Sequence, residues 1–518
     1  MLMLKNRTKL LIASTGIILT WSFIAPLFEF PDEQAHIGTV SYLSQTGSMP
    51  GYGRLDLSKE MMETQLVMGT FRDGLGNNNY TYHPEYHPVY SNSFVGIDES
   101  KIEELNTKEA RFTYVGSEAS KYPPLYYAFL TIADKVVNIG SLIDRVFVMR
   151  MLNILLVPLI ALVAYWYGKI MFDKVIYGRT LAILVILQPM FSFVSAGVNS
   201  DNLHNLLSAL ILLLGLLLIK NGVSPKLILS SVLVLVLDVY TKPQAFINVA
   251  IIGLAYLMSS LIHKQYKSLI FLFLAVGVIA VLGWDQLSPY LGLFSVSNTH
   301  NISFVEYLRF SVDKLLAQNV VWYWGVFKWL GVVLPPIYWQ VANRLVLLSA
   351  IGIGVYYWKV WRKKKITADP FLTLFSLLAT ILYALAIFWY DYQHFKLNGY
   401  SLGIQARYFF PTILAHLSLL LLGITSLGWT TKIRGFLRLT LIGVFIWLQL
   451  GGLYRLTSVY YDSSSITTLI TQASQYKPDY LKGNWWYLWG SIYTLSLYTL
   501  IKISLTQGKP VGVPRRRK

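Results

Sequence analysis

A chain of 518 residues with 54% hydrophobic and only 14% charged residues, and a mean hydropathy of +0.49, is too apolar for a soluble globular enzyme. A net charge of +18 is typical of nucleic-acid-binding proteins, but here the basic residues lie in short stretches between apolar segments. The charge therefore indicates membrane topology instead. With no cysteine, the chain has no disulfide, no thiol chemistry and no cysteine metal site.

Apolar runs of about 18–25 residues recur along the chain, and at ~1.5 Å per residue each can cross roughly 30 Å of hydrocarbon. Most of these runs are apolar on all sides, unlike the surface helices of soluble proteins. We predict helices near residues 9–29, 145–167, 179–197, 202–220, 226–240, 243–262, 267–284, 344–361, 369–390, 409–428, 436–453 and 485–503. The predicted fold class is therefore an all-α polytopic membrane protein with about 12 transmembrane helices.

The basic residues give the predicted orientation in the membrane. They group in the segments Lys5–Lys9, Lys169–Arg179, Lys220–Lys226, Lys264–Lys267, Arg362–Lys365, Lys432–Arg438 and Arg515–Lys518. Short basic segments on one side of the membrane follow the positive-inside rule, so both termini are predicted to be cytoplasmic (N-in, C-in). The loop at residues 30–144, which then lies outside, holds 15 of the 26 acidic residues against 8 Lys and Arg. We predict a multi-pass protein of the plasma (inner) membrane.

The same pattern divides the chain into six parts. These are a first transmembrane anchor (1–29), a long extracytoplasmic loop with juxtamembrane helices and a candidate catalytic Asp (30–144), transmembrane helices 2–7 (145–284), a second extracytoplasmic loop (285–343), transmembrane helices 8–12 (344–503) and a basic cytoplasmic tail (504–518). Any chemistry outside the bilayer must come from the two loops and the shorter outside turns.

Acidic residues follow directly after the first helix, in Phe30-Pro-Asp-Glu-Gln-Ala-His36. Pro31 can begin a short helix whose first turn contains Asp32 and Glu33, where the helix dipole favours carboxylates. Asp32 and His36 are four residues apart and would share one face of that helix. An ordinary helix start with its charges in water explains the same residues, so this pattern alone leaves both interpretations open.

Later in the first loop, Tyr122 lies in the sequence Lys-Tyr-Pro-Pro-Leu-Tyr-Tyr, which opens an apolar stretch ending near Val137. The stretch is short for a span, and counting it as one would reverse the sides of all later basic loops. We therefore predict an interfacial helix on the outer surface, with its tyrosines at headgroup depth. A helix that rests on the membrane without a catalytic part remains the plain alternative.

Polar residues also lie beside helix ends in later outside turns. Asn199 and Asp201 join the third and fourth helices, where a turn with a helix cap is the plain alternative. Lys242 and Arg407 are cations on the outer side, against the positive-inside tendency, although a lone basic residue there can also reach lipid phosphate. These four residues are candidates for an outer site.

The segment His83-Pro-Glu-Tyr-His87 places two histidines four residues apart, as in some zinc sites. The order is not His-Glu-x-x-His, and Pro84 argues against a helix that would align the imidazoles. We therefore predict no zinc site there.

The order of these motifs resembles the GT-C superfamily of membrane glycosyltransferases, which includes protein O-mannosyltransferases and the aminoarabinose transferase that modifies lipid A. The shared order is Pro-Asp-Glu after the first helix, then Tyr-Pro-Pro-Leu-Tyr-Tyr, then Arg150 opening the second helix, then Asn-x-Asp between helices three and four. The late segment Gly403-Ile-Gln-Ala-Arg-Tyr-Phe-Phe-Pro411 is similar to a bacterial branch described mainly as a domain of unknown function, whose pattern is Gly-x-Gln-Gly-Arg-Tyr-x-x-Pro. The resemblance runs from residue 9 to about residue 415.

The resemblance implies a saccharide donor on a polyprenyl phosphate, transfer on the outer face of the membrane, and a carboxylate in the first outside loop as general base. Two departures are visible: Tyr122 stands directly before Pro-Pro where the aminoarabinose transferases have Lys, with Lys121 one residue earlier, and Ala406 replaces the Gly of the branch. The candidate site then comprises Asp32 and Glu33 as catalytic carboxylates, Arg407, Lys242 and Lys121 as ligands of the donor phosphate, and His36, Asn199, Asp201, Tyr122, Gln405 and Tyr408 as further active-site residues.

The chemistry fits such a set of residues. An acceptor hydroxyl must lose its proton as it attacks an anomeric carbon, and a positioned carboxylate that takes it contributes ~10²–10⁴-fold. The leaving phosphate gains charge in the transition state, which a fixed guanidinium or ammonium stabilises. No metal ligand set is predicted and no cofactor is required, although Asp32 and Asp201 with a His are able to hold a divalent ion.

The sequence therefore predicts an inverting glycosyltransferase of the cell envelope. Its partners would be a polyprenyl-phosphate-linked sugar donor, an envelope glycan, lipid or protein acceptor, and the lipid bilayer, with no nucleic acid. Two other classes stay open: a polysaccharide polymerase or ligase that uses a diphosphate-linked carrier, and a transporter or flippase for lipid-linked sugars.

Overall fold

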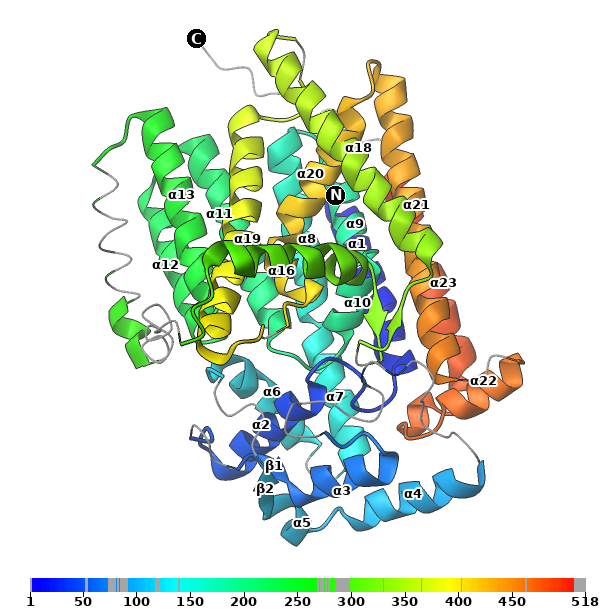
Figure 1. The fold of residues 1–518 in the computed structure, drawn as a ribbon. Helices are drawn as coiled ribbons and strands as arrows, with labels where there is room; N and C mark the ends of the chain where they lie inside the picture. Colours follow the sequence, from blue (N-terminus) through cyan, green and yellow to red (C-terminus); the bar gives the residue numbers. More distant parts are fainter. Residues whose placement is uncertain are drawn as a thin grey trace.

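The computed structural model describes residues 2–51, 55–72, 81, 83, 92–116, 122–137, 140–267, 270, 274, 277, 280–285, 299–328, 330–364, 366–401, 403–461 and 464–506. Helices dominate these residues (Figure 1). Those before residue 264 are α1 (Leu2–Ile24), α2 (Glu33–Thr46), α3 (Lys59–Met68), α4 (Asn92–Glu104), α5 (Lys108–Phe112), α6 (Leu125–Val136), α7 (Leu142–Ile154), α8 (Leu156–Phe172), α9 (Val175–Ile186), α10 (Pro189–Ala196), α11 (Asp201–Asn221), α12 (Pro225–Val239) and α13 (Ala245–His263).

Further helices follow after residue 303. They are α16 (Phe304–Lys314), the π-helix η2 (Leu315–Asn319), α17 (Val320–Trp322), α18 (Pro336–Trp361), α19 (Pro370–Asn398), the 3₁₀ helix η3 (Ala406–Thr412), α20 (Ile413–Ser426), α21 (Thr431–Tyr460), α22 (Ile466–Ala473), the 3₁₀ helix η4 (Asp479–Leu481) and α23 (Trp485–Leu505). Two antiparallel strand pairs complete the described elements: β1 (Leu57–Ser58) with β2 (Tyr114–Gly116), and β3 (Val326–Phe327) with β4 (Val332–Val333).

Seven helical stretches of the described chain are long and apolar enough to cross a membrane, or eight if α9 and α10 form one broken span. They are α7 with α8, α11, α13, α18, α19, η3 with α20, and α21. The prediction of a helical multi-pass membrane protein is thereby confirmed. Its count of 12 stays a prediction, because the predicted helix at 267–284 lies largely outside the described residues and α12 has only 15 residues.

Prolines explain the two breaks inside predicted helices. Pro158 has no N–H and its ring crowds the carbonyl four residues earlier, so the predicted helix at 145–167 breaks between α7 and α8. Pro189 begins α10 after Gln188, whose side chain accepts the N–H of Phe191. This second break bends the path by 64° and turns a single predicted helix into the bent pair α9–α10.

Several helices are longer than predicted. α19 continues past Asp391 to Asn398 and ends only where Gly399 adopts a φ of 75°, a backbone geometry that glycine accepts at little cost. α18 begins at Pro336 rather than near residue 344, since proline is well suited to the first turn of a helix. The residues between the predicted helices at 369–390 and 409–428 are therefore mostly helical, because polar residues alone do not end a helix.

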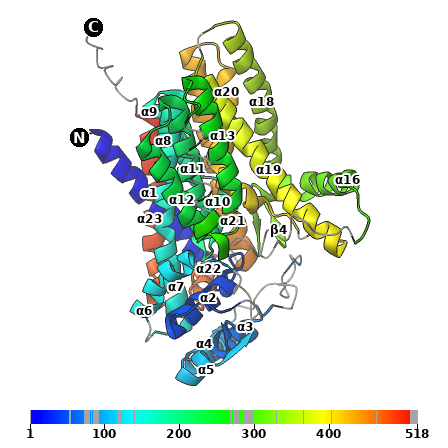
Figure 2. The same ribbon diagram turned by 90° about the vertical axis from the view of Figure 1, so that its left-hand side faces the viewer.

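The helices pack as a bundle with α11 and α20 near its centre (Figures 1 and 2). In the apolar stretch of each span, 72% of the residues are buried for α11 and 89% for η3 with α20. α8 packs against α1, α9 and α11, while α18 packs along α20. α1 and α23 run side by side in opposite directions. The start of α1 and the end of α23 line the same cavity, which shows the opposite directions: Asn6 and Lys9 come from α1, and Lys502 and Thr506 from the end of α23.

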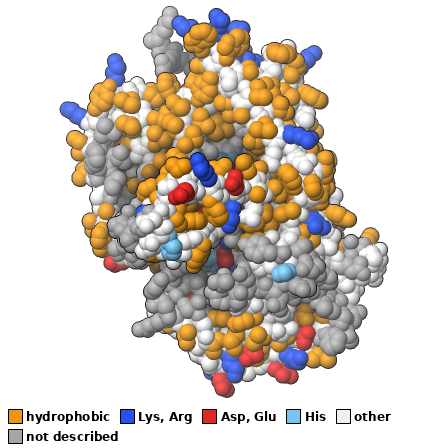
Figure 3. Space-filling view, in the orientation of Figure 1, with side chains coloured by type: hydrophobic (Ala, Val, Ile, Leu, Met, Phe, Trp, Pro, Cys, Tyr) orange, Lys and Arg blue, Asp and Glu red, His pale blue; other side chains and the backbone are white. Residues whose placement is uncertain are grey.

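Charges differ between the two ends of the bundle. Basic side chains gather at the end where α18 leads into α19, and acidic side chains are frequent at the opposite end, around α3 to α5 (Figure 3). The broad band between them is mostly hydrophobic on the face shown. This is the surface expected of a protein that crosses a bilayer with its basic end on one side.

The segment between α1 and α7 folds as a layer across the acidic end (Figure 2). A buried ion network holds it together: Arg145 of α7 pairs with Glu60 of α3 and, at 3.7 Å, with Asp134 of α6, and Arg111 of α5 lies 3.7 Å from Glu60. Breaking a buried pair of this kind leaves an uncompensated charge, so the network fixes how the layer sits on the bundle. α6 is the short helix predicted after Tyr122, and it packs between α2 and α7.

Candidate active site

Asp32 lies just before α2 on an unusual backbone. Its φ is 58°, in the left-handed region that few residues other than glycine occupy, although Asp and Asn tolerate it best. Its carbonyl accepts the N–H of His36 at 3.1 Å, which starts α2 at Glu33. The prediction that Asp32 belongs to the first helical turn is thus corrected: Asp32 precedes the helix as its cap residue.

Two buried basic side chains fix the loop that leads to Asp32. Arg150 donates from Nη1 to the carbonyls of Ser22 (3.0 Å) and Ala25 (3.1 Å) and from Nη2 to that of Pro26 (2.8 Å). Lys477 also donates to the carbonyl of Ala25, at 2.7 Å. The last carbonyls of a helix have no partner within it and carry partial negative charge, so both side chains cap the C-terminus of α1.

Glu33 has a different environment from its neighbour Asp32. Its two carboxylate oxygens accept from Nε (2.8 Å) and Nη2 (2.5 Å) of Arg150, and also from the backbone N–H groups of Phe28 and Val198, both at 3.2 Å. Glu33 and Arg150 are completely buried. This bidentate pair joins α2 to α7, so Glu33 is arranged as a positioning residue, whereas Asp32 remains 38% exposed.

Replacing Arg150 with Met is therefore expected to lower stability strongly. The change leaves the Glu33 carboxylate buried without its cation and removes the Arg150 donor from the carbonyls of Ser22 and Pro26, and loss of one partner of a buried pair typically costs about 3–5 kcal/mol. A lower apparent melting temperature of the protein in detergent, or loss of folded protein, would report it. Lys135→Met on the exposed side of α6 is the matched control, and equal stability of the two variants would contradict the positioning role.

Two guanidinium groups hold the Asp32 carboxylate. Nη2 of Arg407 lies 2.5 Å from Oδ2, and Nη2 of Arg72 lies 3.2 Å from Oδ1. Both arginine side chains are over 90% buried. Burial by itself would raise the pKa of Asp32, but the positive charges of Arg407 and Arg72 outweigh it and hold that pKa well below its usual range.

A second ion pair lies beside the first. Lys242, directly after α12, pairs with Asp201 at the start of α11, and its ammonium lies 5.9 Å from the ring centre of Tyr122. Asn199 connects the two pairs, because its Oδ1 accepts the N–H of Asp201 at 2.8 Å and its Nδ2 donates to the carbonyl of Pro31 at 2.9 Å. The turn before α11 is thereby tied to the Asp32 loop.

His36 lies between the two ion pairs. Its Nδ1 is 2.9 Å from the hydroxyl of Tyr127, on whose ring it stacks, and its ring centre is 5.6 Å from that of Tyr122. Burial lowers the pKa of His36 to about 4, although Asp32 opposes the shift, so the ring is neutral at neutral pH. A neutral imidazole in this place orients neighbours rather than adding a third cation.

An apolar cavity of about 590 Å³ adjoins these residues. Its lining includes Tyr122 and Tyr408, and the ring of Tyr408 lies 5.4 Å from the guanidinium of Arg407. Most of the other lining residues are apolar side chains of α13 and α19, such as Ile247 and Leu385. A space suited to a hydrocarbon chain thus lies beside the charged cluster.

The structure brings most of the predicted site residues together. Asp32, His36, Tyr122, Asn199, Asp201, Lys242, Arg407 and Tyr408 form one cluster of contacts and charge interactions at the acidic end of the bundle. Glu33 is turned away into its pair with Arg150, and Gln405 lines a neighbouring cavity instead. Lys121 lies outside the described residues, so its assignment stays a prediction.

Sequence reasoning missed two members of this cluster. Arg72 lies in a loop that has no motif around it, and nothing in the sequence signals that it reaches Asp32. Tyr127 was quoted only as part of the Tyr-Pro-Pro-Leu-Tyr-Tyr sequence, yet it is completely buried against His36. Its position five residues after Tyr122 in an amphipathic helix is the one signal that could have identified it.

Each carboxylate at the site is neutralised by a cation. Within the ranges that the structure describes, no three His, Asp or Glu side chains converge in a way that could hold a metal ion. In the segment dismissed as a zinc site, His87 lies outside the described residues, so that prediction is not tested.

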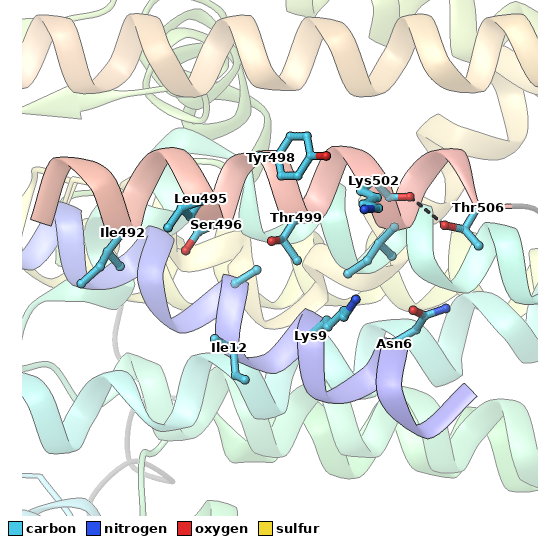
Figure 4. A pocket seen from close by; sticks show the side chains of 12 residues that line it. Asn6, Lys9, Ile12, Ile492, Leu495, Ser496, Tyr498, Thr499, Lys502 and Thr506 are labelled. Carbon is cyan, nitrogen blue, oxygen red and sulfur yellow. Dashed lines mark hydrogen bonds between the residues drawn. The ribbon is translucent and has the colours of Figure 1, made fainter. Parts of the chain in front are cut away.

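Another cavity lies far from Asp32. It has a volume of about 410 Å³ and separates α1 from α23 near the start of α1, with Lys9 and Lys502 at its rim (Figure 4). Since Asp32 follows the other end of α1, this cavity cannot belong to the same site.

Comparisons with known proteins were made for sequence and for fold. A family profile described as "Predicted membrane protein (DUF2142)" matches residues 16–415, and among curated proteins no sequence matches the chain. ArnT from Cupriavidus metallidurans, in the apo state, is similar in structure with 14% identity and a TM-score of 0.39, over 96% of this chain and 76% of that one.

The archaeal oligosaccharyltransferase AglB from Archaeoglobus fulgidus, in complex with an inhibitory peptide and a dolichol-phosphate, is similar with 12% identity and a TM-score of 0.40. The similarity covers 89% of this chain and 56% of that one, so the chain spans little more than half the length of the archaeal enzyme. At these TM-scores the likeness is loose.

Proposed function

This chain belongs to the DUF2142 family of membrane proteins, and we propose that it is an inverting glycosyltransferase that takes its sugar from a polyprenyl-phosphate-linked donor. The acceptor would be a hydroxyl of an envelope glycan, lipid or protein. One observation carries the proposal above all: the Asp32–Arg407 pair lies beside Tyr408, which lines an apolar cavity. That juxtaposition offers a base, an anion ligand and a hydrocarbon site within one small region.

Arg407 has the properties of a phosphate ligand. Its side chain is 4% exposed, and its Nε and Nη1 are buried without a hydrogen-bond partner among the described residues. Leaving such donors unsatisfied costs about 1–3 kcal/mol each, which an incoming phosphate oxygen would recover. Lys242 would supply a second cation, since its ammonium lies near Tyr122, which lines the same cavity.

Asp32 would act as the general base. The acceptor oxygen forms a bond to the anomeric carbon while the bond from that carbon to the phosphate oxygen breaks, and its electron pair leaves with the phosphate. The acceptor proton passes to Asp32. A single displacement of this kind inverts the anomeric centre.

The two arginines make Asp32 a poor base in the free protein, because a carboxylate with a lowered pKa attracts protons weakly. A bound donor phosphate would compete for Arg407 and share its positive charge. The basicity of Asp32 would then rise when the donor is in place, which ties proton removal to an occupied site.

The apolar cavity would hold the first isoprene units of the carrier. Its volume of about 590 Å³ falls within the roughly 300–1,000 Å³ usual for ligand sites, and the side chains of α13 and α19 that line it are mainly aliphatic and aromatic. With the basic end of the bundle in the cytoplasm of the plasma membrane, as the positive-inside rule favours, the site would face the outside. Twelve spans with both termini inside remain part of this proposal.

The direct test is transfer by the purified full-length protein in proteoliposomes. We expect it to consume a polyprenyl-monophosphate-linked sugar and to release the polyprenyl phosphate, with inversion at the anomeric carbon observed by NMR. Turnover of diphosphate-linked donors alone would instead indicate a polymerase or ligase. Movement of the donor between leaflets without cleavage would indicate a transporter or flippase, and either outcome would reject the proposal.

A further inference from the structure

A second cavity, of about 320 Å³, lies beside the apolar one and differs from it in character. Most of its lining is polar: Ser311, Asn319, Asp391, Ser401 and Gln405, together with Trp322. The two cavities share Asp391, Gly403 and Ile404 as a common wall. Gln405 leads directly into η3, the helix that holds Arg407. The polar cavity is therefore next to the proposed reaction centre but is not part of it.

Hydrogen bonds hold several lining residues of this polar cavity in place. Asp391 accepts from the hydroxyls of Tyr307 (2.9 Å) and Ser401 (2.9 and 3.0 Å), and Ser401 in turn accepts the N–H of Gly403 at 3.0 Å. Gly403 has a φ of 83°, which allows the chain to turn at the cavity edge. On the opposite wall, the π-helix η2 ends at Asn319, and π-helical turns are frequent at functional sites.

One buried polar atom in this cavity has no partner. Asn319 is 6% exposed, and its Oδ1 has no hydrogen-bond partner among the described residues. An unsatisfied buried polar group costs about 1–3 kcal/mol, which a ligand hydroxyl would recover. The hydroxyl of Ser311, beside Tyr307, offers a second hydrogen-bonding group for such a ligand.

The chemistry of the lining selects among ligands. Lys314 and Asp391 carry opposite charges, so the cavity lacks the concentrated positive charge that a phosphate requires. Amide, hydroxyl and carboxylate groups bind hydroxyls in any orientation, and Trp322 and Phe310 offer apolar ring surfaces. Hydrogen bonds around an apolar face are what a pyranose ring requires. The small volume suits a single ring at the lower end of the usual range.

We propose that this cavity binds a neutral saccharide ring, carried by either the sugar donor or the acceptor. The inference rests on the proposed function for its biological meaning, since the cavity would hold the sugar unit beside the carrier site. The binding itself depends only on the unsatisfied oxygen of Asn319, on the other polar groups of the lining and on its aromatic rings. It can therefore be tested apart from transfer.

The test uses the full-length protein in nanodiscs and saturation-transfer NMR with a panel of neutral hexoses and short glycans. We expect Asn319→Ala to weaken saccharide binding at least 10-fold without lowering the apparent melting temperature, because it removes an unsatisfied group rather than a contact. Trp322→Phe, which keeps an aromatic ring, should have a smaller effect. Asp313→Asn, an exposed change on α16 outside the cavity, is the matched control.

Steady-state transfer kinetics of the same variants identify the source of the ring. A KM that rises at least 10-fold for the donor alone assigns the cavity to the donor sugar, and a rise for the acceptor alone assigns it to the acceptor. Saccharide binding by a protein that transfers no sugar would reject the proposed glycosyltransferase function but support the proposed saccharide site. Unchanged binding and unchanged KM values in Asn319→Ala, or no saccharide bound by the wild type, would overturn the inference.

Discussion

Replacing Asp32 with Asn is expected to reduce sugar transfer by about 10²–10⁴-fold, which is the usual contribution of a general base. The amide has nearly the shape of the carboxylate but cannot take the acceptor proton. Asn also tolerates the left-handed backbone found at this position, so the protein should still fold and reach the membrane, with a lower melting temperature because Arg407 and Arg72 lose their counter-charge. The measurement is transfer rate per folded protein in proteoliposomes.

The matched control is Asp173→Asn, since the side chain of Asp173 is 94% exposed and lies at the basic end, far from the site. It should transfer sugar at the wild-type rate. Full activity in Asp32→Asn would remove Asp32 from the mechanism altogether. Equal loss of activity and of folded protein would show a structural role instead.

Replacing Arg407 with Ala is expected to raise the KM for the donor and lower kcat, each by roughly 10²-fold or more. The change removes a charge-assisted ligand of the leaving phosphate, and single donors of this kind are typically worth 10²–10³ in rate. The KM for the acceptor should change little. Arg407→Lys keeps the charge but loses the planar pair of donors, so its donor KM and kcat should lie between those of Arg407→Ala and the wild type.

The same variant should also acquire a new pH dependence. In the wild type, Arg407 and Arg72 keep the pKa of Asp32 far below its usual range, so Asp32 stays ionised. The transfer rate should therefore not fall on the acidic side between about pH 8 and pH 5. Without Arg407, the larger of the two arginine charges that lower this pKa is gone, so the pKa of Asp32 should rise and transfer should fall as the pH falls. Arg309→Ala on the exposed side of α16 is the control. An unchanged donor KM and pH profile in Arg407→Ala would refute the phosphate role.

The sequence was sufficient to predict the membrane bundle and much of the candidate site. Length and apolar composition locate α11 and α13 within a few residues, because a bilayer imposes the same requirement on every span. The short motifs around Asp32, Asp201 and Arg407 identify residues that do converge. Their common signal is a charge beside a helix end, and that signal is local enough to be read from a sequence.

Other parts of the site depend on long-range packing that no local pattern contains. Arg72 reaches Asp32 from a loop, and the sequence around it would suit any exposed turn. Glu33 resembles Asp32 in sequence, yet only the fold decides that Glu33 meets Arg150 while Asp32 remains partly exposed. The helix boundaries near Pro336 and Gly399 were missed for a related reason, since hydropathy reports membrane depth and not where a helix ends.

The ion pair between Asp32 and Arg407 joins residues that are 375 positions apart. During synthesis, the carboxylate emerges with the first helix, but its guanidinium partner emerges only after most of the bundle has been inserted. A nascent or truncated chain that ends before η3 therefore carries an incomplete centre. The protein thus becomes competent only at the close of its own biogenesis, when the late helices dock against the early ones.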